Sequence, residues 1–134
     1  MADVPEVLFM CTHNAGRSQM AAALLAREGG DAVRVTSAGS EPASQVNPAV
    51  AAAMAEIGVD ISREIPKPLA AGQAAAADIV ISVGCGDACP VFPGKRYLVW
   101  ELPVPAGLSV EQVRPIRDDI AARVRALLKE LEVS

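Results

Sequence analysis

The 134-residue sequence is poor in aromatic side chains, since one Trp, one Tyr and two Phe make up only 3% of it. Because 51% of the residues are hydrophobic, the core must be built from Ala, Val, Ile and Leu. Positive charge is not in excess either, and the formal net charge is −4. A general nucleic-acid binder needs a basic face, so we expect no nucleic-acid partner.

Long hydrophobic runs are also missing. None approaches the roughly 18 residues of a membrane-spanning segment, and the N-terminus lacks the pattern of a signal peptide. We therefore expect a cytoplasmic protein without a membrane partner. A chain of this length is expected to fold as one domain, residues 1–134, and to be a monomer by default.

Cysteine is scarce and its count is odd, with Cys11, Cys85 and Cys89 in the whole chain. An odd number does not suit a framework of structural disulfides. In a reducing compartment, such cysteines are more typical of reactive chemistry or of metal binding.

The sequence does contain an alternation of strand and helix patterns. Continuous apolar runs predict strands that are buried on both faces, and shorter runs predict two more, giving strands at 7–11, 33–36, 79–83 and 96–100. Helices are predicted between and after them, at 17–26, 48–57, 69–77 and from 110 onward. The pattern predicts an α/β fold with an open, four-stranded, mostly parallel sheet flanked by helices.

The last predicted helix begins with a capping box, Ser109 with Gln112, and contains Pro115. Proline inside a helical pattern removes a hydrogen bond, so we expect a kink or a fresh start there. The arginines of this helix interleave with acids, which predicts a solvated face for Arg114, Arg117, Arg123 and Arg125.

Cys11 ends the first predicted strand, and Arg17 opens the helix that follows a loop of small and polar residues. Backbone N–H groups of such a loop can converge on a tetrahedral anion, and the helix N-terminus adds a favourable potential. Arg17 offers a bidentate fork to the anion, and the same field favours a thiolate. The sequence therefore predicts that Cys11 is a nucleophile, although a strand-end cysteine can also be a small buried residue.

Cys85 and Cys89 follow the third predicted strand, so we expect Cys85 at the same sheet edge as Cys11. Three interpretations remain open. The two cysteines could be packed residues, or a zinc site could combine Cys11, His13, Cys85 and Cys89. Arg17 beside the metal and the three-residue spacer count against zinc. A thiol relay is the interpretation that uses every cysteine.

The segments VLFMCTHNAGRSQM, SAGS, GCGDACPVFPGKRY and W-E-L…P-A-G resemble the thioredoxin-coupled arsenate reductases. That family shares the fold of the low-molecular-weight tyrosine phosphatases. The resemblance extends from about residue 6 to the last helix. The first segment fits phosphatases as well, whereas the pair Cys85 and Cys89 favours a reductase.

By this resemblance, Cys11 attacks the arsenic of arsenate, and Cys85 then attacks the Cys11 sulfur and releases arsenite. Cys89 takes over the disulfide, which thioredoxin reduces. The resemblance implies no cofactor, and phosphate or sulfate would occupy the arsenate site.

The resemblance also implies roles around the nucleophile. Ser18 would donate a hydrogen bond to the Cys11 thiolate, and Asn14 would hold the loop in shape. The oxyanion-binding residues are then Thr12, His13, Asn14, Ala15, Gly16, Arg17 and Ser18.

The chain departs from its relatives at several positions. Many carry an aspartate, the phosphatase general acid, where this chain has Val104, and Glu101 is the nearest carboxylate in sequence. Some carry a potassium-binding glutamate at Ala22, so we expect no metal site. His13 replaces a glycine, and is either a cation beside Cys11 or a hydrogen-bonded loop residue.

Three alternatives to the reductase stay open. A tyrosine-phosphatase-like hydrolase would need Cys11 and Arg17 but neither Cys85 nor Cys89. Transfer of arsenate to a small thiol such as mycothiol or glutathione would need Cys11 alone. The alternative that is not an enzyme is a cysteine-based sensor of arsenite or zinc.

Overall fold

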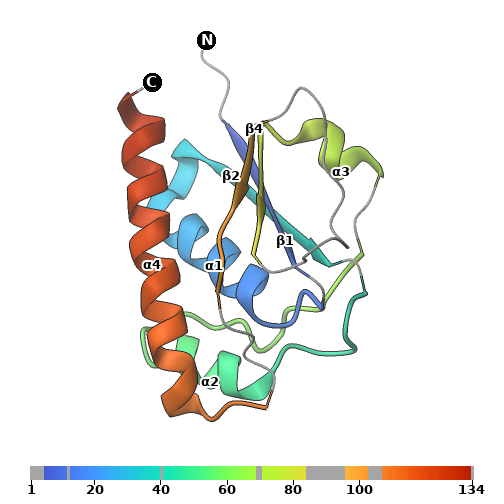
Figure 1. Ribbon diagram of the computed structural model, residues 1–134, viewed down its shortest axis with the longest axis vertical. Helices are drawn as coiled ribbons and strands as arrows, with labels where there is room; N and C mark the ends of the chain where they lie inside the picture. The colour runs from blue at the N-terminus through green and yellow to red at the C-terminus, as the bar shows by residue number, and fades with distance from the viewer. Residues whose placement is uncertain are drawn as a thin grey trace.

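A computed structural model describes residues 5–11, 13–39, 41–68, 71–83, 96–102 and 107–133. Its four strands form one sheet in the order β2-β1-β3-β4 (Figure 1). They are β1 (Glu6–Cys11), β2 (Arg34–Gly39), β3 (Ile79–Ser82) and β4 (Arg96–Val99). Every neighbouring pair is parallel. The predicted α/β fold with a four-stranded sheet is confirmed.

The α-helices among the described residues are α1 (Arg17–Gly29), α2 (Pro48–Ala55), α3 (Ala71–Ala76) and α4 (Val110–Val133), and a short 3₁₀ helix η1 (Gly30–Ala32) follows α1. Asn47 caps α2, because its side chain accepts a hydrogen bond from the Ala49 amide at 2.9 Å. The capping box of α4 is also present. Gln112 N donates to Ser109 Oγ at 3.3 Å, and Ser109 N donates to Gln112 Oε1 at 3.0 Å.

Pro115 lies inside α4, which continues without a break, so of the kink or fresh start that we expected, the fresh start does not occur. The residue sits near the helix N-terminus. The bond that its missing N–H removes would have reached the carbonyl of Glu111, on an exposed turn where water can take its place. Among the described residues, no helix is both long and apolar enough to cross a membrane.

The helices cover both faces of the sheet, with α1 and α4 on one side and α3 on the other (Figure 1). Successive side chains of β1 point to opposite faces of the sheet. Val7 and Phe9 belong to the larger hydrophobic core with α1, α2 and α4, whereas Leu8 and Met10 belong to a smaller one. The ring of Trp100 packs against Phe9 with centroids 5.5 Å apart. β1 is thus buried on both faces, as its continuous apolar run predicted.

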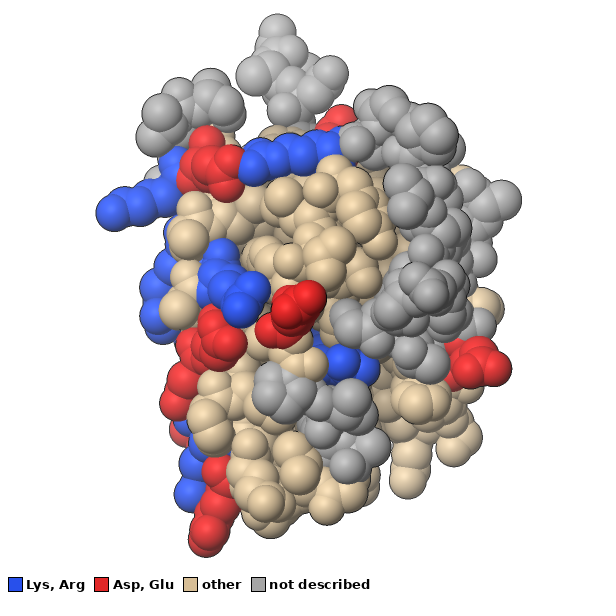
Figure 2. Space-filling model, in the orientation of Figure 1, with Lys and Arg blue, Asp and Glu red and all other residues tan. Residues whose placement is uncertain are grey.

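Basic and acidic side chains alternate along the edge of the molecule formed by α4 (Figure 2). Arg123, for example, pairs with Asp119 at 3.0 Å. The expectation of a solvated face is wrong for Arg117, which is only 8% exposed. Its Nη1 donates to the carbonyl of Ala53 at 2.7 Å and to Glu56 at 2.8 Å. Because α4 packs on α2, this guanidinium supplies a donor to a carbonyl at the end of α2.

Candidate active site

Cys11 is the last residue of the central strand β1, and it is paired in register with Gly39 of β2. On the other side, the amide of Val83, just beyond β3, donates to the carbonyl of Met10 at 2.7 Å. Cys11 therefore lies at the carboxyl edge of the sheet, between two neighbouring strands. Ligands of open parallel sheets bind at this edge.

The Cys11 side chain is 2% exposed, yet its sulfur contacts polar groups. The backbone N–H of Asn14 donates to Sγ at 3.2 Å, and Ser18 Oγ lies 2.8 Å from Sγ. Asn14 Nδ2 donates to the same Ser18 Oγ at 2.8 Å. Because that oxygen already accepts from Asn14, its own proton is available to the sulfur. The Cys11 sulfur therefore has hydrogen-bond partners as well as apolar packing contacts.

Asn14 is fully buried and has a left-handed backbone conformation, with φ of +51°. Asparagine tolerates this region better than most residues. Gln19 Nε2 donates to both the Asn14 carbonyl and Oδ1, at 3.1 Å each. The backbone N–H of Lys67 donates to Oδ1 at 3.0 Å. Asn14 therefore joins the loop, helix α1 and the segment before α3.

The carbonyls of the loop are tied to the segment that precedes α2. His13 O accepts from Ala43 N, and Ala15 O accepts from Asn47 N, both at 2.9 Å. A trans peptide unit places its C=O and N–H on opposite sides. With the His13 carbonyl bonded to Ala43, the N–H of the same peptide unit points to Cys11 Sγ. The outward bonds thus help to turn the loop amides toward the site.

Arg17, the first residue of α1, is 6% exposed. Its Nη1 donates to the carbonyl of Leu102 at 3.3 Å. Burial desolvates the cation and lowers the pKa of Arg17, and the charge of Cys11 opposes that shift. A guanidinium has five N–H donors, so the bond to Leu102 fixes the side chain while leaving donors for an oxyanion.

The structure brings together most of the predicted site residues, namely Cys11, His13, Asn14, Ala15, Gly16, Arg17 and Ser18. Thr12, Cys85, Cys89 and Val104 lie outside the described residues, so two of the four ligands of the zinc hypothesis cannot be placed. Within the described ranges, no group of three or more His, Cys, Asp and Glu side chains could hold a metal ion.

Two of the residues considered in the sequence, His13 and Glu101, are exposed. The His13 side chain lines an open groove with Ala43, Asn47 and Gly107, so its role stays a prediction. Glu101 is also exposed.

Sequence reasoning missed three groups of the site. Gln19 had a signal, since it is a polar residue in the first turn of a helix whose other buried positions are mostly small or apolar. Lys67 and Leu102 contribute backbone atoms, and no pattern of side chains in the sequence predicts which backbone atoms reach the site.

The fold and the site define a class of α/β proteins in which a strand-end cysteine is followed by a short loop and a helix N-terminus. The chain belongs to the low molecular weight phosphotyrosine protein phosphatase family, whose model matches residues 6–134.

Several relatives share a narrower name. The chain is 37% identical over 127 residues to a putative arsenate reductase of Halobacterium salinarum, which covers 91% of this chain and 89% of that protein. It is 36% identical over 129 residues to a glutaredoxin arsenate reductase of Synechocystis sp., covering 94% and 98%. The resemblance to arsenate reductases that we noted in the sequence is confirmed.

A solved structure agrees with them. A thioredoxin-dependent arsenate reductase of Corynebacterium glutamicum superimposes with a TM-score of 0.82 at 47% identity. The match covers 98% of this chain but 63% of that one, so the chain spans less than two thirds of that protein.

Proposed function

We propose that the protein reduces arsenate to arsenite by attack of Cys11 on the bound oxyanion, followed by a Cys11–Cys85–Cys89 relay that thioredoxin resets. One observation carries the proposal. The buried Cys11 Sγ accepts from the Asn14 amide at 3.2 Å and lies 2.8 Å from Ser18 Oγ. Arg17 is buried in the same loop–helix unit. The arsenate reductases among the relatives support the choice of substrate.

In the first step, the Cys11 thiolate attacks arsenic and one arsenate oxygen leaves as water. Arg17 and the loop N–H groups hold the remaining oxygens, while the Asn14 amide and the Ser18 hydroxyl donate hydrogen bonds to Sγ. The product is a covalent thiol–arsenate adduct in which arsenic is still As(V).

In the second step, the Cys85 thiolate attacks Cys11 Sγ. The S–As bond breaks and its electron pair stays on arsenic, which leaves as arsenite, As(III). The two electrons come from the two sulfurs, which end as a Cys11–Cys85 disulfide. Cys89 then attacks Cys85 and frees the Cys11 thiolate, and a thioredoxin dithiol reduces the Cys85–Cys89 disulfide.

The experiment that tests this function measures arsenate-dependent oxidation of thioredoxin. The wild type should turn over repeatedly, and Cys11→Ser should be inactive. Cys89→Ser should complete about one turnover, because the relay stops with the disulfide on Cys85. Mass spectrometry of tryptic peptides should then find a Cys11–Cys85 disulfide.

Other results would favour other reactions. Repeated thioredoxin-driven turnover by Cys89→Ser would refute the relay. If Cys89→Ser turns over with glutathione or mycothiol instead, the reaction is transfer of arsenate to a small thiol. Since one relative is named a glutaredoxin arsenate reductase, a glutaredoxin–glutathione mixture is a necessary arm of the assay.

The second candidate function is hydrolysis of a phosphate ester, which the description of the family favours. Such a phosphatase would need Cys11 and Arg17 but neither Cys85 nor Cys89. Robust hydrolysis of p-nitrophenyl phosphate by the wild type, with arsenate acting only as an inhibitor, would favour the hydrolase.

A further inference from the structure

Gln19 is linked to Cys11 through two intervening side chains, those of Asn14 and Ser18. The residue follows Ser18 in the first turn of α1, and its side chain is 4% exposed. Among the described residues, no hydrogen bond joins Gln19 directly to Cys11. Its Nε2 reaches Asn14, whose Nδ2 donates to Ser18 Oγ at 2.8 Å, and that oxygen lies 2.8 Å from Cys11 Sγ.

The direction of these hydrogen bonds follows from a backbone group whose identity is unambiguous. The Asn14 carbonyl can only accept, so the Gln19 amide must present its NH₂ group there, at 3.1 Å. The same nitrogen lies 3.1 Å from Asn14 Oδ1, which must therefore be the oxygen of that side chain. The backbone N–H of Lys67 donates to Oδ1 at 3.0 Å and agrees with this orientation.

The orientation of Asn14 decides what Ser18 can do. With Oδ1 held by Gln19 and Lys67, the Asn14 NH₂ group faces Ser18, and the Ser18 proton is left for the sulfur. If the Asn14 amide were reversed, its oxygen would compete with Cys11 for that proton. The donors on Oδ1 therefore determine whether Cys11 receives a hydrogen bond from Ser18.

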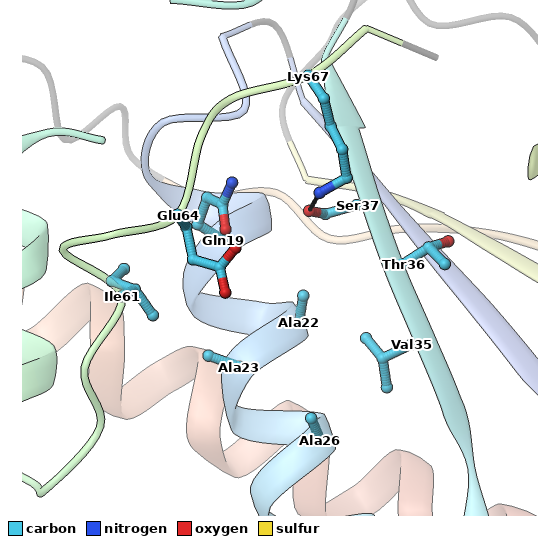
Figure 3. A pocket seen from close by; sticks show the side chains of 10 residues that line it. All are labelled: Gln19, Ala22, Ala23, Ala26, Val35, Thr36, Ser37, Ile61, Glu64 and Lys67. Atoms are coloured by element: carbon cyan, nitrogen blue, oxygen red, sulfur yellow. Dashed lines mark hydrogen bonds between the residues drawn. The ribbon is translucent and has the colours of Figure 1, made fainter. Parts of the chain in front are cut away.

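Gln19 is held for this task by its surroundings. It lines a cavity of about 240 Å³ between α1 and β2, with Ser37, Glu64 and Lys67 among the other lining residues. In Figure 3 its amide nitrogen points away from Ala22 and Ala23 and toward the side of the cavity where the Lys67 segment runs. The amide is thus directed to Asn14 rather than into the open part of the cavity.

We propose that Gln19 is a positioning residue that orients the Asn14 amide so that the Ser18 hydroxyl donates its proton to Cys11 Sγ. The inference rests on Cys11 being the nucleophile of the proposed function. Gln19 touches neither the anion nor the sulfur and acts through two other side chains. Lys67 provides one donor to Oδ1 from its backbone, so the loss of Gln19 weakens the orientation without abolishing it.

The test measures the rate at which iodoacetamide alkylates Cys11 as a function of pH, because only the thiolate reacts. The tryptic peptide that ends at Arg17 contains Cys11 and separates its signal from Cys85 and Cys89. Four proteins are compared with the wild type: Gln19→Met, Ser18→Ala, their double variant, and Gln73→Met. Gln73 is the control, a partly buried side-chain amide whose Nε2 donates to a backbone carbonyl, that of Ser37, at 3.1 Å.

Gln19→Met should raise the pH of half-maximal alkylation by up to about one unit, and slow alkylation below it by about two- to tenfold. The double variant should match Ser18→Ala, since without the hydroxyl the orientation of Asn14 no longer matters to the sulfur. Gln73→Met should match the wild type. Arg17, the cation whose charge couples to Cys11, is the same in every protein.

Two results would overturn the proposal: an unchanged pH profile in Gln19→Met, or effects of the two substitutions that add in the double variant. A merely structural role of Gln19 predicts such additivity. Gln19→Leu replaces Gln19→Met if the latter does not fold.

The wild type provides an independent measurement. Alkylation of Cys11 should shift the side-chain NH₂ resonances of Asn14 and Gln19 but not of Gln73. A stationary Gln19 signal would count against the inference. Neither assay uses arsenate, so a failure of arsenate reduction would be visible separately.

Discussion

Arg17 combines a charge with near-complete burial. Its side chain is 6% exposed, and its Nη1 donates to the Leu102 carbonyl at 3.3 Å. Burial lowers its pKa, while the charge of Cys11 acts in the opposite direction. A lysine carries its donors on one atom, so it cannot bond Leu102 and present a planar pair of donors to an anion at once.

Arg17→Lys should therefore weaken the protection of Cys11 by bound anions. We expect the concentration of arsenate or phosphate that halves Cys11 alkylation to rise about tenfold or more, since a bidentate charged contact is replaced by a point charge. Arg123→Lys, in an exposed ion pair with Asp119, is the control and should leave protection unchanged. Equal protection in Arg17→Lys would show that the loop amides alone bind the anion.

Asn14 holds the loop while its own backbone has an unfavourable left-handed conformation, with φ of +51°. Both Asn14→Gly and Asn14→Ala lose the side-chain bonds to Ser18, Gln19 and Lys67, but only alanine is strained at this φ. We expect both variants to be less stable than the wild type, and Asn14→Ala to be about 1 kcal/mol less stable than Asn14→Gly. Urea unfolding measures the difference. Equal stabilities would mean that the loop relaxes to another conformation.

At the scale of the elements, the end of α1 packs closely against α4 and against the residue that precedes β2. A Cβ added at Gly29 would lie 2.4 Å from Val33 Cγ1 and 3.1 Å from Leu128 Cδ2 of α4. Val33 is buried, and its β-branched side chain has little freedom to turn away. Gly29 is therefore required by the packing of α1 against α4 and the start of β2.

Gly29→Ala should lower the free energy of unfolding by about 1–3 kcal/mol, as overpacking does in other cores. Gly72→Ala, in α3, is the matched substitution, because no atom of the described residues lies within 4 Å of its added Cβ. It should be neutral or stabilising by up to about 1 kcal/mol, from helix propensity. Chemical denaturation of the two variants compares them directly. The argument fails if Gly29→Ala is as stable as Gly72→Ala.

Helices α2 and α4 are joined by ion pairs on Glu56, at the end of α2. Hydrogen bonds from Arg114 and then from Arg117 lower the pKa of Glu56 from 4.5 to about 2. Since the folded-state pKa lies below the unfolded-state value, the pairs stabilise the fold above that value. Their contribution is lost as the pH falls from 4.5 through about 2.

Glu56→Gln should therefore reduce the unfolding temperature at neutral pH and flatten its decline in acid over that window. Thermal scans at several pH values measure both effects. Glu41→Gln, at another exposed glutamate, is the control and should keep the slope of the wild type. A wild-type slope in Glu56→Gln would mean that the ion pairs contribute nothing to stability.

For the whole molecule, the two candidate reactions differ in their need for a general acid. A phosphatase must protonate its leaving group, and a positioned acid contributes about 10²–10⁴-fold. The resemblance noted in the sequence implies that Val104 stands where many relatives carry that acid, and a valine cannot donate a proton. Arsenate reduction needs the acid less, because its departing oxygen can leave as water from an already protonated oxyanion.

Val104→Asp should therefore raise hydrolysis of p-nitrophenyl phosphate more than it raises arsenate reduction. Parallel assays of the two reactions measure the ratio. If Glu101 already serves as the acid, Glu101→Gln would reduce both activities and Val104→Asp would add little. That result would assign the proton to the exposed Glu101 instead.

Much of the architecture could be predicted from local patterns. The apolar run before Cys11 indicated a strand buried on both faces, and Asn47-Pro48 and Ser109-Gln112 marked two helix starts that the structure contains. β2 was predicted too short, at 33–36, whereas it extends to Gly39. Its last residues are small or polar and become a strand only because they pair with Phe9, Met10 and Cys11.

The sequence by itself determined that Cys11, Arg17 and the loop between them form one local unit, because they lie within seven residues; that Cys11 is the nucleophile stays a prediction. Only the tertiary structure decided how that loop is held. The bond from Arg17 to Leu102 spans 85 positions, and the bond from Lys67 to Asn14 spans 53. Both use backbone atoms, which every residue possesses, so their partners are selected by the packing of the sheet and helices and not by residue type.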